Sequence, residues 1–281
     1  MIGEGKEYYN NGNLKFVGEY LNGKRNGKGK EYDFNGKIQF EGEYLNGVLH
    51  GKGKEYYFGI LVYEGEYLNG KRSGKGKEYY GKDKLVFEGE YFNGKRNGKG
   101  KEYEYDGKLE FEGKYLNGKK WDGKGYNIKS NIDFEIKDGK GNIKEYDYFE
   151  GILVFEGEYL NGDKNGKGKE YYYSDVLKFE GEYLNGERNG YGKEYYFSNK
   201  LLFEGEYVKG KIWNGKGYNI DGIVEFEIKE GKGDIKKYDY IEGKLNFEGE
   251  YSIIIIILHL GKKKTLFIIG IIQRYSLIYN K

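Results

Sequence analysis

The stretch FVGEYLNGKRNGKGKEY, residues 16–32, contains the pattern from which most of this chain is built. It begins with Phe, Gly and Tyr at alternate positions, continues through an Asn-Gly pair, and ends by alternating Lys with Gly. Alternation with a period of two on both sides of an Asn-Gly pair is typical of a β-hairpin. The stretch therefore predicts two short antiparallel strands joined by a tight turn.

Nearly the same phrase recurs through the chain, at spacings of 21–24 residues. A fixed period of this length indicates a repeat architecture. Trp121 and Trp213, 92 residues apart, stand in matching surroundings, which indicates a duplicated block of four units. The sequence predicts a repeat array of about ten to eleven units over residues 1–251 and a separate tail over 252–281. The units start at Phe16, Phe40, Tyr63, Phe87, Phe111, Phe134, Phe155, Phe179, Phe203, Phe226 and Phe247.

The alternation places aromatic rings and glycines on one face of each hairpin. In the second unit we expect Tyr44 to lie opposite Gly51 or Gly53, because a ring supports a glycine in a sheet. A slip of one residue would move charges onto the aromatic face, so the pattern specifies the register. The repeat-defining residues are Phe40, Gly42, Tyr44, Gly51, Gly53, Tyr63, Gly65, Tyr67, Phe87, Gly89 and Tyr91.

The opposite face carries the charged residues. The same register places Glu43 opposite Lys52 or Lys54, and each such exposed pair contributes about 0.2–1 kcal/mol. Glu55 falls on the aromatic face in this register, and a bulge or an edge position would each explain it. The recurring carboxylates Glu41 and Glu43 are interpreted as charged sheet positions, because an active site is a single asymmetric group of residues.

Together these observations predict an all-β protein: an elongated, twisted, single-layer antiparallel sheet of consecutive β-hairpin repeats. No unit can bury its own apolar face, so stability is expected to come from contacts between neighbours. Hairpins of roughly 10 Å each would give a sheet on the order of 100 Å long.

Several segments resemble the MORN (membrane occupation and recognition nexus) repeat, whose pattern is Tyr-x-Gly-x-Trp/Tyr followed by spaced glycines. YEGEYLNGKRSGKG (63–76) fits this pattern, and FEGEYFNGKRNGKG (87–100) has Phe at its first position. The resemblance covers residues 3 to about 251, although Tyr replaces Trp in most units. It implies a hairpin array and a role in anionic phospholipid contact, in dimerisation and scaffolding, or as an accessory module on an enzyme. A related variant occurs in antitoxins.

The composition excludes several classes of protein. There is no cysteine, hence no disulfide framework or thiolate site. The net charge is +2, and a tail with five basic residues and no acid leaves about −3 for residues 1–250, which argues against nucleic acid as a partner. The Gly-x-x-x-x-Gly-Lys spacing at residues 18–24 lacks the following Ser/Thr and a helix, so nucleotide binding is not expected. His50 and His259 are too isolated for a metal site.

The hairpin turns carry the basic residues that we consider for binding. Equivalent positions in three units would form a basic stripe along one edge of the sheet. Such a stripe could contact anionic headgroups or an acidic partner, or it could simply keep the edge soluble. The candidate contacts are Lys24, Arg25, Lys28, Lys71, Arg72, Lys75, Lys95, Arg96 and Lys99.

The tail 252–281 is rich in Ile and Lys and leaves three alternatives open. Its apolar runs of about eight residues are shorter than the roughly 20 needed for a spanning helix, so membrane contact would be interfacial. A terminal β-hairpin that caps the array, or out-of-frame sequence, would also fit its composition.

The sequence predicts a non-enzymatic repeat scaffold for protein–protein interaction or self-association. Peripheral binding to anionic phospholipid through the basic turns is the alternative, and antitoxin-like inhibition of a protein toxin is a further one. No cofactor, metal or small-molecule substrate is expected. With no apolar segment at the start of the chain, we expect a cytoplasmic protein, with attachment to a membrane surface left open.

Overall fold

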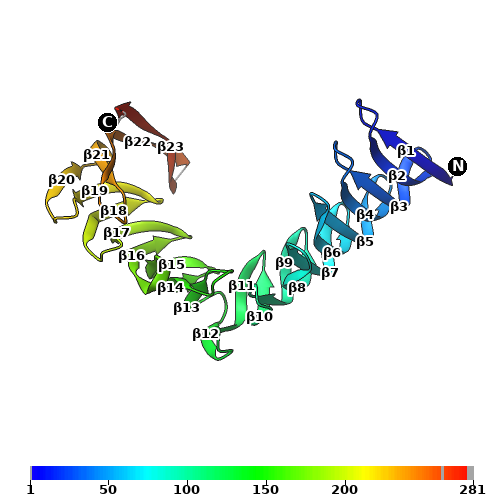
Figure 1. Ribbon diagram of the computed structural model, residues 1–281, viewed down its shortest axis with the longest axis horizontal. Helices are drawn as coiled ribbons and strands as arrows, with labels where there is room; N and C mark the ends of the chain where they lie inside the picture. The colour runs from blue at the N-terminus through cyan, green and yellow to red at the C-terminus, as the bar shows by residue number, and fades with distance from the viewer. Residues whose placement is uncertain (1, 261–262, 277–281) are drawn as a thin grey trace. The chain divides into compact units, whose positions relative to one another are not determined.

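The computed structural model describes residues 2–260 and 263–276, which form β-strands and connecting turns. The chain divides into two compact units, Met1–Gly139 and Lys140–Lys281. In the first unit, twelve strands form one open antiparallel sheet in chain order, so each strand pairs with its neighbours in sequence (Figure 1). These strands are β1 (Ile2–Tyr8), β2 (Leu14–Leu21), β3 (Lys24–Tyr32), β4 (Ile38–Leu45), β5 (Val48–Tyr57), β6 (Ile60–Leu68), β7 (Lys71–Tyr80), β8 (Lys84–Phe92), β9 (Lys95–Tyr103), β10 (Leu109–Leu116), β11 (Lys119–Tyr126) and β12 (Ile132–Ile136).

The second unit contains an eight-stranded sheet and a three-stranded sheet, both also in chain order. One short 3-10 helix, η1 (Tyr173–Asp175), interrupts the strands. The first sheet has β13 (Gly141–Tyr146), β14 (Leu153–Leu160), β15 (Asp163–Tyr171), β16 (Leu177–Leu184), β17 (Glu187–Tyr195), β18 (Leu201–Val208), β19 (Lys211–Tyr218) and β20 (Val224–Ile228). The second sheet has β21 (Lys232–Tyr238), β22 (Leu245–Leu260) and β23 (Lys263–Ser276).

The all-β array of consecutive hairpins predicted from the sequence is confirmed. The tail contributes the end of β22 and all of β23, and these two strands pair antiparallel. Residues 261–262 and 277–281 of the tail lie outside the described residues. In the second unit the three-stranded sheet packs beside the first through a cluster of Ile228, Ile235, Tyr251 and Ile253.

The aromatic rings of successive repeats pack against one another. The ring of Phe40 lies 5.6 Å from that of Tyr44 in its own strand and 5.4 Å from that of Tyr67 in the next hairpin, both edge to face. The same geometry joins Phe16 to Tyr44 at 5.3 Å. Such pairs contribute about 0.5–1.5 kcal/mol each beyond the area they bury. The rings are therefore buried by contact between units, although the sheet has a single layer.

The predicted packing of rings over glycines is present. A Cβ atom added to Gly42 would lie 2.8 Å from Cζ of Phe40, and one added to Gly53 would lie 2.4 Å from the same atom. Real Cβ contacts are not this short, so these positions require glycine because the ring occupies the space that a side chain would take.

The expected register of Tyr44 is wrong within its own hairpin. Tyr44 lies opposite Leu49, not Gly51 or Gly53, because a bulge in β5 places three residues against Glu43 alone. Gly51, with φ +73°, sits in this bulge. Tyr44 instead lies opposite Gly27 of the preceding hairpin. The bulge thus removes Gly51 from the position opposite Tyr44, whose ring packs against Phe16 of the preceding unit.

The expected charge pairing changes in the same way. Glu43 lies opposite Lys28 of the preceding hairpin rather than Lys52 or Lys54. Lys54 lies opposite Glu41 within the hairpin, and Lys52 lies opposite Glu66 of the next one. Opposite charges therefore still face each other across the strands. For Glu43 and Lys52, however, the residue opposite belongs to a neighbouring repeat.

Candidate functional site

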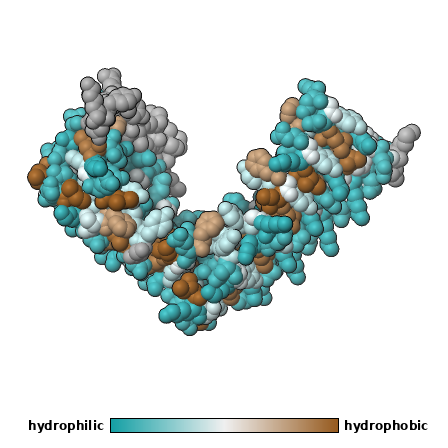
Figure 2. All heavy atoms as spheres, in the orientation of Figure 1, coloured by the Kyte–Doolittle hydropathy of each residue, from teal (hydrophilic) through white to brown (hydrophobic). Residues whose placement is uncertain are grey.

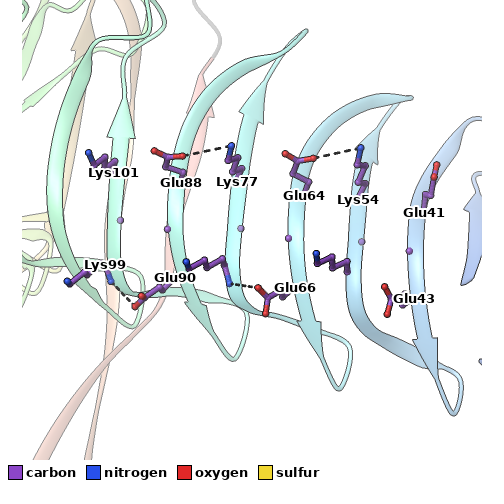
Figure 3. A pocket seen from close by; sticks show the side chains of 18 of the residues that line it. Glu41, Glu43, Lys54, Glu64, Glu66, Lys77, Glu88, Glu90, Lys99 and Lys101 are labelled. Carbon is purple, nitrogen blue, oxygen red and sulfur yellow. Dashed lines mark hydrogen bonds and ion pairs between the residues drawn. The ribbon is translucent and has the colours of Figure 1, made fainter. Parts of the chain in front are cut away.

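Two faces of the first unit carry different chemistry, and we name them by their residues. The aromatic face holds the rings and the glycines that they cover. The charged face holds alternating Glu and Lys side chains in two rows, which run along the sheet on either side of the central glycines (Figure 3). These rows and glycines line a groove of about 1280 Å³. The groove is lined by residues of several consecutive repeats in this unit.

The central row of the charged face consists of the Glu that precedes each central glycine and the Lys that follows one, such as Glu64 before Gly65 and Lys77 after Gly76. Its carboxylates also accept hydrogen bonds from tyrosines: the Tyr79 hydroxyl donates to Glu64 at 2.6 Å, and Tyr103 donates to Glu88 at 2.7 Å. The central-row charges are therefore paired with one another. Ion pairs between neighbouring hairpins join Lys30 to Glu41 (3.3 Å), Lys54 to Glu64 (3.8 Å), Lys77 to Glu88 (4.0 Å) and Lys101 to Glu112 (3.4 Å).

The turn row lies nearer the Asn-Gly turns, and its carboxylates have a structural role. Glu90 accepts a hydrogen bond from the backbone N–H of Lys99 at 3.0 Å, and Glu66 accepts one from Lys75 at 3.4 Å (Figure 3). Each of these carboxylates lies against the positive-φ glycine of a bulge, such as Gly98. The turn-row glutamates therefore satisfy the backbone donors that the bulges leave unpaired.

The aromatic face carries a second set of charges. Glu55 lies there, opposite Phe40 and Tyr63 in the two neighbouring strands. Arg72 donates to both oxygens of Glu55, at 3.1 Å and 2.5 Å, and its guanidinium carbon lies 4.0 Å from the centre of the Tyr63 ring. A bidentate guanidinium stacked on a ring is a favourable arrangement that lysine cannot reproduce. Glu55 is thus half-buried beside its partner. The register with β6 shifts between Glu55 and Tyr56, as the bulge explanation requires, whereas β5 is not an edge strand.

This arrangement recurs as a ladder of alternating Glu and Arg across neighbouring hairpins. Arg72 also contacts Glu78, and Arg96 joins Glu78 to Glu102. In the second unit, Arg188 joins Glu170 to Glu194 at 2.7 Å and 2.6 Å. Tyrosines support the same carboxylates: Tyr67 donates to Glu55, Tyr91 to Glu78 and Tyr183 to Glu170. We refer to these residues as the Glu–Arg ladder.

The Glu–Arg ladder shifts the pKa values of its carboxyl groups. Arg25 extends the ladder by joining Glu7 to Glu31. Its hydrogen bonds lower the pKa of Glu7 to about 2, against the opposing effect of burial. Burial alone would raise the pKa of Glu55, but hydrogen bonds from Arg72 and Tyr67 lower it. The pKa of Glu170 is lowered in the same way by Arg188. Since the ionised form is stabilised in each case, the ladder is a set of charge pairs that hold the fold together.

The predicted basic stripe is wrong for its arginines. The side chains of Arg25, Arg72 and Arg96 are only 18%, 26% and 20% exposed, because each lies on the aromatic face between two carboxylates. The physical reason is that the strand already begins at the turn, so Arg72 is a residue of β7 that lies opposite Tyr67 on the aromatic face. The six lysines of the set, in contrast, are exposed: Lys24, Lys28, Lys71, Lys75, Lys95 and Lys99.

The Glu–Arg ladder is the feature that the sequence interpretation missed. Arg72 and Glu78 are six residues apart, and Glu55 precedes Arg72 by 17, so local spacing does not indicate the contact. One signal was present: Glu55 breaks the alternation by falling among the rings. Its equivalents Glu78 and Glu102 do the same, and a repeated charge at an apolar position indicates a buried partner.

Among residues 2–260 and 263–276 no cluster of three or more His, Cys, Asp or Glu side chains has a metal-binding arrangement. His50 lies in β5 and His259 in β22. Within the part of the chain that the structure describes, no helix has the length and apolar character that crossing a membrane requires. What the geometry offers is a regular charged groove in the first unit.

Comparison with known proteins identifies the repeats. The MORN repeat family model matches six segments, residues 16–38, 40–58, 63–83, 87–108, 155–175 and 179–199. No curated protein matches the chain. Solved structures that align with it include TcdB2-TccC3 and TcdB2-TccC3-Cdc42, each at 9% identity and a TM-score of 0.17, over 98% of this chain and 18% of the other. This chain therefore spans less than a fifth of their length, and a TM-score this low supports no conclusion about fold.

Proposed function

We propose that this chain, which is a MORN repeat protein, acts as a non-enzymatic scaffold that binds protein partners or further copies of itself. The observation that supports the proposal is the charged groove of the first unit, a surface that extends over several repeats. MORN repeats are a non-enzymatic repeat type. Repeat arrays provide long, regular surfaces of this kind, on which contacts are distributed over many units.

Sedimentation velocity of the purified full chain over a range of concentrations tests whether the chain self-associates. Affinity capture with the full chain tests whether it binds a protein partner. The comparison is a variant that carries Glu64→Lys and Glu88→Lys on the charged face. We expect either a mass that rises with concentration or a partner that the variant loses. A monomer at every concentration, with no captured protein that depends on the charged face, would contradict the proposal.

A second candidate function is contact with an anionic membrane surface, and one observation favours it. The exposed lysines of the hairpin edge, such as Lys71 and Lys95, pair with exposed apolar residues, Leu68 and Phe92, which are 51% and 65% exposed. Figure 2 shows hydrophobic side chains among hydrophilic ones on the face in view. Basic residues near an anionic membrane contribute about 1 kcal/mol each. Flotation with anionic vesicles at low and physiological salt tests this candidate: salt-sensitive binding supports it, and no binding removes it.

A further inference from the structure

The turn row of the charged face contains a set of exposed lysines that the fold does not use. No ion pair to another described residue involves Lys52, Lys75 or Lys99, whereas Lys54 and Lys77 in the central row are paired across the strands. The set lies on β3, β5, β7, β9 and β10. Its members are Lys28, Lys52, Lys75, Lys99 and Lys114.

The reason for the unpaired lysines lies in the bulges. Glu66 and Glu90, which stand beside these lysines in the sheet, direct their carboxylates toward backbone N–H groups and bulge glycines. Those carboxylates are therefore held away from the ammonium groups that the strand register places next to them. The ammonium groups remain available to an outside anion.

The spacing of these lysines limits what the anion can be. From Lys28 to Lys99, successive members such as Lys52 and Lys75 stand one hairpin apart, which is two strands or roughly 10 Å. Lys114 lies on the next strand, directly opposite Lys99. A turn-row glutamate, such as Glu66, stands between them. A uniformly negative surface would lie against these carboxylates as often as against the lysines, so repulsion would offset the attraction. An extended polypeptide advances about 10 Å in three residues, so carboxylates at every third residue would meet lysines alone.

An apolar ridge runs along the edge of the groove nearest the turn row. By the alternation of the strand, Leu45 shares a face with Glu43, two residues earlier. The ridge residues Leu45, Leu68, Phe92 and Leu116 are 42%, 51%, 65% and 39% exposed. An occupant with apolar side chains beside its carboxylates would cover this ridge.

We propose that the charged groove of the first unit binds an extended acidic protein segment, whose carboxylates recur at about every third residue and pair with the turn-row lysines. This inference rests on the proposed scaffold function and specifies the chemistry of the partner. The second unit differs at the equivalent positions: Tyr191 replaces lysine and donates to Glu204, and Lys167 is the lysine retained. The site is therefore assigned to the first unit alone.

The test is fluorescence anisotropy of the full chain with a labelled peptide that repeats Asp-Ser-Leu along the length of the row. A peptide of equal composition, with its Asp residues grouped together, is the ligand control. The variant carries Lys52→Gln, Lys75→Gln and Lys99→Gln. The matched control carries Lys54→Gln, Lys77→Gln and Lys101→Gln, which removes the same charge from the same strands.

We expect the spaced peptide to bind more tightly than the grouped peptide and the turn-row variant to lose about tenfold in affinity, with a much smaller loss in the control. Equal binding of the two peptides, equal losses in the two variants, or binding of anionic vesicles in place of the peptide would each overturn the inference. If sedimentation still shows self-association, the scaffold function stands while this partner assignment fails.

Discussion

Tyr63 places a hydroxyl group where the neighbouring repeats have Phe. Its side chain is fully buried, and its hydroxyl oxygen finds no hydrogen-bond partner in the described part of the chain. The ring lies under Arg72 and over Gly76 in the same way as the Phe rings lie in their own repeats. An unpaired buried hydroxyl costs about 1–3 kcal/mol, so this residue weakens the repeat in which it lies.

Tyr63→Phe is therefore expected to raise the free energy of unfolding by about 1 kcal/mol, because it removes the unpaired hydroxyl and keeps the ring. Urea unfolding followed by tyrosine fluorescence or circular dichroism measures the change. Tyr67→Phe is the matched control and should lower stability, since the Tyr67 hydroxyl donates to Glu55 at 2.6 Å. Destabilisation by Tyr63→Phe would show that the hydroxyl has a partner.

The carboxyl group of Glu170 leads to a prediction of how the stability of the fold depends on pH. Its folded pKa lies below the 4.5 of the free side chain, because Arg188 binds the ionised form. A lowered folded pKa gives stability that is present above pH 4.5 and is lost as pH falls through the folded pKa. We expect Glu170→Gln to cost about 1 kcal/mol at pH 7 and to flatten this acid-side slope. Exposed Glu187→Gln is the control for the same change of charge in urea titrations at each pH, and equal flattening in both variants would contradict the role of Arg188.

At the scale of the element, the hairpin β4–β5 differs from its neighbours at one ladder position. Leu49 lies opposite Tyr44, where Arg72 lies opposite Tyr67 and Arg96 lies opposite Tyr91. The Glu–Arg ladder is interrupted at this hairpin, and the hydroxyl of Tyr44 has no described partner. The apolar side chain of Leu49 occupies the strand position that arginine holds in the neighbouring hairpins.

Leu49→Arg should complete the ladder, because the new guanidinium would lie over Phe40 as Arg72 lies over Tyr63. It would reach Glu55 from the side opposite to Arg72. We expect the free energy of unfolding to rise by about 0.5–1 kcal/mol, the gain typical of a partly exposed pair. Leu49→Gln serves as the control for polarity alone. A fall in stability with Leu49→Arg in urea unfolding would count against the ladder as a stabilising element.

At the scale of the whole molecule, each unit is stabilised by contacts between adjacent hairpins. Strand pairing in chain order means that a local defect acts first on the hairpins next to it. Gly53 tests this property, because an added Cβ would lie 2.4 Å from the Phe40 ring.

Gly53→Ala is expected to cost about 2–3 kcal/mol, since the buried ring cannot yield. Amide hydrogen exchange should show faster exchange in β4 to β7 and unchanged protection in β14 to β19 of the second unit. The control Gly47→Ala, in an open turn with φ +91°, should cost about 1 kcal/mol through backbone strain alone. Faster exchange throughout both units would indicate that the chain unfolds as a single cooperative body.

The candidate groove could be predicted in part from the sequence. The alternation placed Glu41 and Glu43 on one face and Phe40 on the other, because side chains in a strand alternate regardless of context. The arginines were not placed, because the sequence interpretation counts them as turn residues, whereas Arg72 is the second residue of β7 and lies opposite Tyr67. The bulge at Gly51 depends on a backbone conformation and on the Glu43 carboxylate that lies against it.

The sequence by itself determined the repeat, its length, its two strands and the identity of its rings and glycines, since each of these follows from local periodicity and turn chemistry. The tertiary structure alone decided which strand supplies each partner. Tyr44 faces Gly27 of another hairpin, and Arg72 binds Glu55 of the hairpin before it. The physical reason is that bulges shift the register within a hairpin, while packing between hairpins selects the neighbours that bury rings and pair charges.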